Sequence, residues 1–231
     1  MKLLLLSNST MAGKPYLSWA NEYFQLFIGK NPKNILFLPY AGVNVYWEGY
    51  TKKVADYFSQ FGHHTTSIYK QKDFEKIISE TDIIMVGGGN TFHLVYYLHK
   101  NSLIDLIREA VLNGKPYIGW SAGANIACPT LCTTNDMPII QPRNFNTLNL
   151  VQFQINPHYT DVNPKGHAGE TREDRIMEYL EINRDKTVIG LREGSGLLIE
   201  NGRFKLIGKK RAKLFRYGQE TEELKAGDLQ I

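Results

Sequence analysis

The sequence predicts a single α/β domain built on a mostly parallel, doubly wound sheet. Short apolar runs typical of strands alternate with segments of helical periodicity along most of the chain. Polar or glycine-rich residues follow several of these runs, where open parallel sheets place their sites. The length of 231 residues suits one α/β domain, and no linker, repeat or low-complexity tract divides residues 1–231.

In the first half of the chain, the predicted strands cover residues 2–7, 34–39, 65–69, 82–86 and 116–120. The predicted helices cover 16–28, 47–61, 74–79 and 102–113, and one further helix begins near Thr91. In the 102–113 helix, Leu103, Ile107 and Val111 share one face, and Ser102 and Gly114 suit its two ends.

After Asn125 the pattern loosens into polar loops. We expect a strand over 151–155, a helix over 172–180 and a strand over 187–191. The C-terminal residues 196–207 predict a β-hairpin, because Asn201-Gly202 is a favoured two-residue turn.

Composition and charge exclude several classes of protein. The apolar run 3–6 is shorter than a signal-peptide core and no stretch is long enough to span a bilayer, so we expect a cytoplasmic protein without a membrane partner. The net charge is only +4, and its basic cluster suits a solvated hairpin face as well as a nucleic-acid surface; this cluster comprises Lys205, Lys209, Lys210, Arg211, Lys213 and Arg216. Because no nucleic-acid motif accompanies the cluster, we expect no nucleic-acid partner.

The two cysteines, Cys128 and Cys132, are too few for a disulfide framework. They also lack nearby histidine or cysteine partners that would complete a metal site. We therefore expect both to be small buried residues.

Residues 119–123 (GWSAG) match the G-x-S-x-G pattern of a nucleophile elbow. In such an elbow a serine sits on a strained turn, and small neighbours let the backbone fold sharply. The same small residues also suit a tight strand-to-helix turn without chemistry. The predicted strand before Ser121 and the helix start after it favour a nucleophile.

A serine nucleophile needs a base within hydrogen-bond reach and an acid that orients the base. Among the six histidines we expect His158 to be the base, because Asn156-Pro157 holds it rigidly just beyond the strand 151–155. The alternative is a structural histidine in a turn. Two acids fit the third position and remain open: Asp136, which gives the chain order of α/β-hydrolases, and Glu193, which follows the strand 187–191.

Residues 86–90 (VGGGN) form a glycine-rich loop after a predicted strand. A nucleotide-binding loop is excluded, because Phe92 stands where the dinucleotide fingerprint needs glycine and no Lys-Ser/Thr pair follows. The glycines can instead turn backbone N–H groups inward, so that this loop and the Ala122 N–H form an oxyanion hole. A close-packed strand-to-helix turn is the alternative.

Arg172 stands at the first position of the helix that Thr171 and Asp174 begin with a capping-box pattern. The helix dipole disfavours a cation there, whereas an arginine beside free helix N–H groups is a good receptor for a carboxylate. We consider two roles: Arg172 recognises an acidic group on a substrate, or it is a solvated arginine paired with Glu170 or Glu173.

Seven collinear segments carry a resemblance to a known family, namely 3–10 (LLLLSNST), 39–43 (PYAGV), 86–92 (VGGGNTF), 118–125 (IGWSAGAN), 133–139 (TTNDMPI), 155–158 (INPH) and 169–176 (GETREDRI). Through them the sequence closely resembles the peptidase E, or α-aspartyl dipeptidase, family of serine peptidases. Beyond Gly196 no such segment is found.

The resemblance implies a cytoplasmic enzyme that removes N-terminal aspartate from Asp-Xaa dipeptides without a metal or organic cofactor. It implies a fold related to the class I glutamine amidotransferases and hence flavodoxin-like, with serine in place of their cysteine. The implied site residues are Ser121 as nucleophile, His158 as base, Glu193 as orienting acid, Asp136 as an essential residue of nearby or competing role, and Gly89 and Ala122 as oxyanion donors. A substrate aspartate would supply the carboxylate that Arg172 suits, and the further candidates for substrate contact are Asn90, Gly88 and His167. Whether the protein is a monomer or a homodimer, and what binds the substrate amino group, stay open.

Two other functions are compatible with these residues. One is a related serine hydrolase of different specificity, such as a cyanophycinase-like or ester-cleaving enzyme. The other is a non-catalytic, amidotransferase-like binding module whose small-residue turns hold a ligand.

Overall fold

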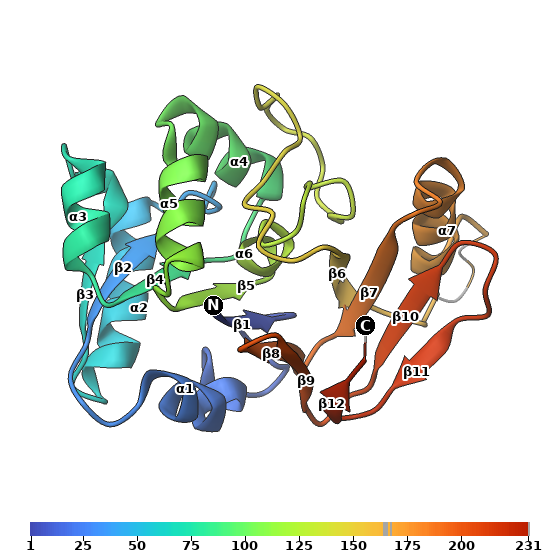
Figure 1. Ribbon diagram of the computed structural model, residues 1–231, viewed down its shortest axis with the longest axis horizontal. Helices are drawn as coiled ribbons and strands as arrows, with labels where there is room; N and C mark the ends of the chain where they lie inside the picture. The colour runs from blue at the N-terminus through green and yellow to red at the C-terminus, as the bar shows by residue number, and fades with distance from the viewer. Residues whose placement is uncertain (164–165, 167, 231) are drawn as a thin grey trace.

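In the computed structural model, which describes residues 1–163, 166 and 168–230, two β-sheets lie side by side with helices around them (Figure 1). Within these residues the larger sheet has eight strands in the order β12-β9-β8-β1-β5-β4-β2-β3. Its strands are β1 (Lys2–Leu6), β2 (Asn34–Leu38), β3 (His64–Ser67), β4 (Ile83–Val86), β5 (Tyr117–Trp120), β8 (Ser195–Glu200), β9 (Arg203–Gly208) and β12 (Gly227–Leu229). The five neighbouring strands β1, β5, β4, β2 and β3 are parallel to one another. Strands β8, β9 and β12 extend this sheet by antiparallel pairing.

The smaller sheet has the order β11-β10-β7-β6. Its strands are β6 (Gln154–Tyr159), β7 (Thr187–Arg192), β10 (Ala212–Arg216) and β11 (Glu222–Leu224). Strands β6 and β7 are parallel, and the other pairs are antiparallel.

Helices cover both faces of the larger sheet (Figure 1). They are α1 (Asn21–Ile28), α2 (Trp47–Ser59), α3 (Phe74–Glu80), α4 (Thr91–Lys100), α5 (Leu103–Leu112) and α6 (Ala122–Asn125), while α7 (Arg172–Ile182) packs on the smaller sheet. Strand β1 shows why both faces are apolar: Leu3 and Leu5 pack in the core of α3, α4 and α5, and Leu4 packs in the core of α1 and α2. A strand buried on both sides becomes a continuous apolar run, as in LLLL.

The predicted mixed α/β fold with a mostly parallel sheet is confirmed in the helix-covered half. The C-terminal hairpin is also confirmed: β8 and β9 pair antiparallel, and Asn201 and Gly202 have the positive φ values (51° and 76°) of a favoured hairpin turn. The hairpin is not a separate tail, because β8 pairs with β1 and extends the larger sheet.

Several expected element bounds are wrong. The strand expected over 151–155 is β6, which covers Gln154–Tyr159 and contains His158. The strand expected over 65–69 ends at Ser67 and continues as a 3-10 turn, and the helix expected from 16 begins as a 3-10 turn over Ser18–Ala20. Ser102 does not cap α5 with its side chain, because its left-handed backbone (φ 53°) belongs to the tight turn from α4.

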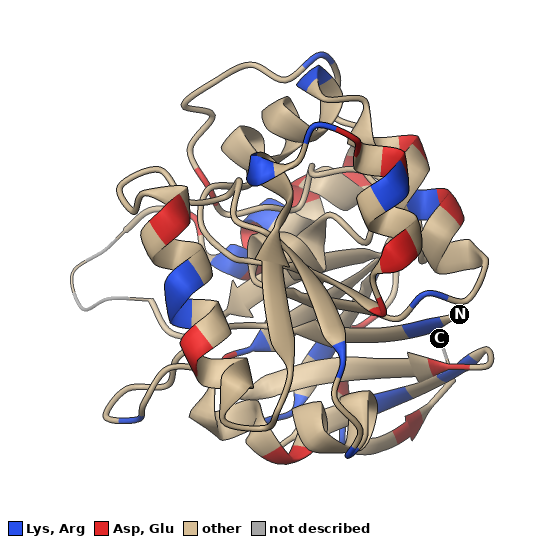
Figure 2. Cartoon of the chain, turned by 90° about the vertical axis from the view of Figure 1, so that its left-hand side faces the viewer, with Lys and Arg blue, Asp and Glu red and all other residues tan. Residues whose placement is uncertain are grey.

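Basic and acidic residues are both distributed over the helices and strands (Figure 2). Within the basic C-terminal cluster, Lys213 lies 3.3 Å from Asp161 and 2.9 Å from Glu173, so this lysine is an ion-pair partner and not part of a free basic face. Over the part of the chain that is described, none of the helices is long and apolar enough to cross a membrane.

The two cysteines differ in environment. Cys128 is buried, and its sulfur accepts a hydrogen bond from the Ile155 N–H at 3.1 Å. Burial raises the pKa of its thiol. Cys132 is exposed, so the expectation that both are buried is wrong for this residue; the irregular loop after Pro129 turns it away from the core.

Candidate active site

The site lies at the carboxyl ends of three neighbouring parallel strands, β1, β5 and β4. Ser7 follows β1, Ser121 follows β5, and the glycine loop begins at Gly87 directly after β4. Because all three strands run in the same direction, their ends meet at one edge of the sheet, as the sequence indicated.

Ser121 has a backbone conformation that residues other than glycine rarely adopt. Its φ is 53° and its ψ is −115°, between the end of β5 and the start of α6. The turn is also tightly packed, since a Cβ on Gly119 would lie 2.2 Å from the Gly123 carbonyl oxygen. Both features considered for residues 119–123 are therefore present together: small residues pack the turn, and a strained serine stands at its tip.

His158 reaches the site from the smaller sheet. Its φ is 54°, and the pairing register of β6 with β7 shifts between Pro157 and Tyr159. Such a bulge re-aims the bulged side chain. The rigid loop expected around His158 is therefore wrong: it lies within a strand, and Pro157 is tolerated because β6 is an edge strand.

The side chains of Ser121, His158 and Glu193 form a row. His158 Nε2 lies 2.9 Å from Ser121 Oγ, and His158 Nδ1 lies 2.8 Å from Glu193 Oε1. A carboxylate only accepts hydrogen bonds, so Nδ1 carries the proton toward Glu193 and Nε2 is left to accept from the serine hydroxyl. This is the polarity that a general base requires.

Asp136 has different partners. Its Oδ2 accepts hydrogen bonds from Thr91 N at 2.7 Å, from Thr91 Oγ1 at 2.6 Å and from Thr134 Oγ1 at 3.0 Å. It thus ties its own loop to the N-terminus of α4, where a negative charge is favourable. Of the two acids left open by the sequence, only Glu193 is hydrogen-bonded to His158 among the described residues.

The glycine loop packs against the serine turn. A Cβ on Gly88 would lie 2.9 Å from Ser121 Cβ, and one on Gly89, whose φ is 137°, would lie 2.2 Å from the Ala41 carbonyl oxygen. Over residues 1–163, 166 and 168–230, the N–H groups of Gly89 and Ala122 donate no hydrogen bond. An N–H group without an acceptor in these residues can serve as an oxyanion donor.

Arg172 is the first residue of α7, and the capping box of Thr171 and Asp174 is present as expected. Its guanidinium donates to Asn135 Oδ1 at 2.6 Å, and Glu170 is paired instead with Arg175 at 3.8 Å. Partial burial, followed by the nearby Arg175, lowers the Arg172 pKa. Asn135 also donates to the Pro157 carbonyl at 2.6 Å, so Arg172 is linked through one side chain to the residue before His158.

The remaining substrate-contact candidates have different surroundings. Asn90 caps α4, since its Oδ1 accepts from His93 N at 3.0 Å and its Nδ2 donates to the Met137 carbonyl at 2.9 Å. Gly88 and Asn90 both line a cavity next to the serine turn. His167 lies outside the described residues.

Two polar residues that were not singled out from the sequence join the strand ends. Ser7 Oγ donates to the Leu191 carbonyl at 2.7 Å and accepts from His158 N at 2.9 Å. Asn8 Oδ1 accepts from Gly194 N at 2.9 Å. The sequence does contain a feature that indicates them as site residues: Ser7 and Asn8 directly follow a fully apolar strand, at its carboxyl end.

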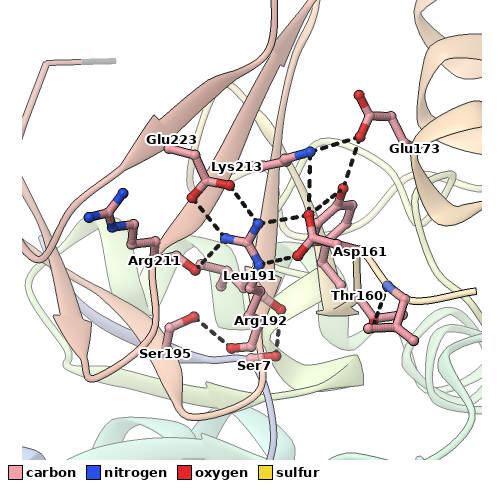
Figure 3. Close-up of polar contacts among 12 residues, drawn as sticks. Ser7, Thr160, Asp161, Glu173, Leu191, Arg192, Ser195, Arg211, Lys213 and Glu223 are labelled. Carbon is pink, nitrogen blue, oxygen red and sulfur yellow. Dashed lines mark hydrogen bonds and ion pairs between the residues drawn. The ribbon is translucent and has the colours of Figure 1, made fainter.

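A cluster of ion pairs connects the segment that follows His158 to the residue that precedes Glu193 (Figure 3). Its members are Asp161, Glu173, Arg192, Lys213 and Glu223. Arg192 Nε lies 2.6 Å from Asp161 Oδ2, and its Nη2 lies 2.6 Å from Glu223 Oε1. Lys213 bridges Asp161 and Glu173. Arg192 directly precedes Glu193, so the cluster fixes the end of β7 from which that acid projects.

A strained serine, a histidine and a carboxylate in one hydrogen-bonded row at the edge of a parallel sheet is the arrangement of a serine hydrolase. Comparison with known proteins identifies the family within the serine hydrolases. The model of peptidase family S51 matches residues 3–207. Peptidase E of Nostoc sp. is 48% identical over 222 residues, covering 96% of this chain and 92% of that protein. Peptidase E of Salmonella paratyphi A is 44% identical over 227 residues, covering 98% and 99%.

Solved structures show the same fold at low identity. A peptidase from an acI-B1 actinobacterium superposes with a TM-score of 0.73 at 17% identity, covering 100% of this chain and 96% of that chain. A putative peptidase E protein from Listeria monocytogenes gives 0.66 at 23% identity, covering 90% and 98%. The chain belongs to peptidase family S51 and is a serine dipeptidase of that family.

Proposed function

We propose that this dipeptidase hydrolyses dipeptides with N-terminal aspartate, Asp-Xaa, through an acyl-enzyme on Ser121. The observation that carries the proposal is the hydrogen-bonded row from Ser121 through His158 to Glu193, with distances of 2.9 and 2.8 Å. Because Nε2 accepts from the serine hydroxyl and Nδ1 donates to Glu193, His158 can accept the serine proton while Glu193 stabilises the resulting imidazolium.

In the first half of the reaction, Ser121 Oγ attacks the carbonyl carbon of the aspartyl residue and its proton passes to His158 Nε2. The negative charge that develops on the carbonyl oxygen is stabilised by the N–H groups of Gly89 and Ala122. Collapse of this intermediate breaks the C–N bond, and His158 returns the proton to the leaving amino group. Water then attacks the aspartyl ester with His158 again as base, which releases aspartate and restores the serine hydroxyl.

Arg172 supplies the preference for aspartate. Its guanidinium is half-buried, has no carboxylate partner among the described residues and stands at a helix N-terminus. These features suit a receptor for the aspartate side-chain carboxylate. The contact of Arg172 with Asn135, which itself donates to the carbonyl of the residue before His158, supports this role.

The nucleophile is tested by hydrolysis of Asp-Leu with the wild type and Ser121→Ala. We expect kcat to fall by about a millionfold, as for loss of other serine nucleophiles. Retained hydrolysis by Ser121→Ala would overturn the proposed mechanism, as would failure of a serine-directed phosphonate to label Ser121.

The substrate class is tested with Asp-Leu, Asn-Leu, Glu-Leu and a small ester. We expect kcat/KM for Asp-Leu to exceed that for Asn-Leu by about tenfold to a hundredfold, the range of a charge-assisted hydrogen bond. Arg172→Met removes this preference, whereas Arg184→Met, which removes an exposed arginine paired with Glu181 at 3.2 Å, retains it. Equal turnover of Asn-Leu by the wild type would remove the role of Arg172, and a preference for the ester would indicate a hydrolase of another specificity.

We also infer that residues 1–231 form one domain of the flavodoxin-like, class I glutamine amidotransferase type. One apolar core supports this, because it contains residues of both sheets, such as Leu5 of β1, Ile155 of β6 and Leu214 of β10. The row of Ser121, His158 and Glu193 also draws on both sheets. A single cooperative unfolding transition, followed by circular dichroism and by activity, is the expected result.

A further inference from the structure

A cavity of about 610 Å³ opens beside the serine turn. Its wall includes Gly88 and Gly89, and Gly88 is in contact with Ser121. Tyr50 fixes this wall, because its hydroxyl donates to the Gly88 carbonyl at 3.1 Å and accepts from Trp120 Nε1 at 3.1 Å. The volume is within the range of small-molecule sites.

The described lining of the cavity combines apolar side chains with two neutral amides, Asn44 and Asn90, and one cation. Tyr16, Val45, Tyr50 and Ile139 supply apolar surface, and Lys53 is the one charged side chain among the described residues that line it. Lys53 stands three residues after Tyr50 on α2, and its Nζ lies 4.1 Å from the centre of the Tyr16 ring. Within the described part of the chain it forms no ion pair.

A second polar group without a partner lies beside this lysine. The Tyr16 hydroxyl is buried and makes no hydrogen bond to the described residues. Burial, as the largest cause, raises the pKa of Tyr16 well above its usual value, so the hydroxyl stays protonated and able to donate. A cation and a donor together form a receptor for a carboxylate.

The loop 133–139 separates the two carboxylate receptors. Near its start Asn135 contacts Arg172, and at its end Ile139 lines the cavity. A dipeptide whose aspartate side chain lies at Arg172 and whose carbonyl lies at Ser121 therefore extends its second residue toward the cavity.

We propose that this cavity binds the leaving residue of the substrate, with its side chain against the apolar wall and its free C-terminal carboxylate at Lys53 and Tyr16. The inference rests on the proposed Asp-Xaa hydrolysis and deepens it. It explains a restriction to dipeptides: a longer peptide has an uncharged amide where the carboxylate of a dipeptide meets Lys53.

The test compares Asp-Leu with Asp-leucinamide, which differs only by loss of the C-terminal charge. For the wild type we expect kcat/KM to be about tenfold higher for the acid, with the difference mainly in KM and reduced by 0.5 M salt, because Lys53 is exposed at the mouth of the cavity. Lys53→Met brings the ratio of acid to amide close to one. Lys53→Arg restores most of the preference.

Lys52→Met is the matched control, because Lys52 is the neighbouring lysine on α2 and pairs with Asp56 at 2.7 Å. It removes the same charge and retains the preference for the acid. Equal kcat/KM for acid and amide in the wild type, or an unchanged ratio in Lys53→Met, would overturn the assignment of Lys53 while leaving Asp-Xaa hydrolysis intact. Failure of the wild type to cleave either compound would instead overturn the proposed function and, with it, this inference.

Discussion

The two acids considered as partners of His158 differ in what their carboxylates bind. Glu193 is half-exposed and bonds to the imidazole, whereas Asp136 accepts three hydrogen bonds from Thr91 and Thr134. We expect Glu193→Gln to lower kcat by up to about 10⁴-fold, the effect of turning the orienting carboxylate of a serine protease into an amide. Its free energy of unfolding should change by less than about 1 kcal/mol, because the side chain is solvated.

Asp136→Asn should act differently. It weakens three charge-assisted hydrogen bonds at the start of α4, so we expect the free energy of unfolding to fall by about 1–3 kcal/mol. Urea unfolding of both variants measures this difference. An unfolding loss in Glu193→Gln as large as that in Asp136→Asn would contradict the separation of the two roles.

Gly88 offers a steric test of the serine turn. A Cβ at this position lies 2.9 Å from Ser121 Cβ and 3.2 Å from the Trp120 carbonyl oxygen, so Gly88→Ala must displace the nucleophile. We expect kcat for Asp-Leu to fall by about a hundredfold, since a displacement of 1 Å has this effect on positioned reactants. Gly49→Ala on α2, where a Cβ meets nothing within 4 Å, is the control and should retain full activity.

The sequence led to Ser121 and His158, and to Glu193 as one of two acids, because each residue carries a local signal: a small-residue turn, a preceding proline, and a position just after an apolar strand. It left Asp136 and Glu193 undecided, since a hydrogen bond to His158 depends on which loop lies beside β6. Ser7 was missed although it directly follows β1, because its role depends on two distant partners: the His158 N–H, 151 residues away in the chain, and the Leu191 carbonyl, 184 residues away.

At the scale of elements, the ion cluster ties the segment after β6 to the end of β7. Hydrogen bonding from Arg192 is the main reason why the pKa of Asp161 is lowered from 3.8 to about 2. The folded state thus binds a proton at Asp161 less readily than the unfolded chain. Its contribution to stability is present above about pH 4, the ordinary aspartate pKa, and is lost as the pH falls toward 2.

We therefore expect the free energy of unfolding to decrease between pH 4 and pH 2, and Asp161→Asn to show a smaller decrease over this range. Urea unfolding at half-unit pH intervals measures both slopes. Asp228→Asn, which removes a carboxylate that forms no ion pair among the described residues, is the control with the wild-type slope. If the free energy of unfolding of Asp161→Asn decreased with falling pH as steeply as that of the wild type, the proposed role of the Asp161–Arg192 pair would be contradicted.

Strand β6 illustrates why element bounds were predicted less well than element types. The sequence indicates a strand near 151, but Asn156-Pro157 resembles its end. Tertiary pairing extends the strand to Tyr159, because Pro157 lies on the open edge of the smaller sheet and the bulge at His158 absorbs the irregularity. The same bulge turns the imidazole toward Ser121.

At the scale of the whole molecule, the smaller sheet depends on residues beyond the recognisable segments. Phe215 of β10 is fully buried among Tyr159, Ile176, Leu180 and Val188, between β6 and α7. We expect Phe215→Ala to lower the free energy of unfolding by about 3–5 kcal/mol, the range for buried aromatic residues. Phe145→Ala, at a side chain that is 51% exposed, should cost less than about 1 kcal/mol.

Urea unfolding of both phenylalanine variants measures these losses. Equal stability of Phe215→Ala and the wild type would mean that β10 contributes nothing to the packing that supports His158. A large loss in this variant, together with reduced activity at temperatures well below its melting point, would show that the same packing also positions the site.

The sequence by itself determined the α/β class, the parallel strands of the larger sheet and two residues of the row, Ser121 and His158, because periodicity, turns and strand ends are local properties of a chain. Only the tertiary structure decided that the strands form two sheets, that Glu193 and not Asp136 meets His158, and that Lys53 faces a cavity beside Ser121. These facts depend on which distant segments lie together, and many arrangements satisfy the same local pattern. Residues 3–8 illustrate both contributions. The apolar run LLLL identifies a buried strand from the sequence alone, whereas only tertiary packing makes Ser7 and Asn8 the link between the two sheets.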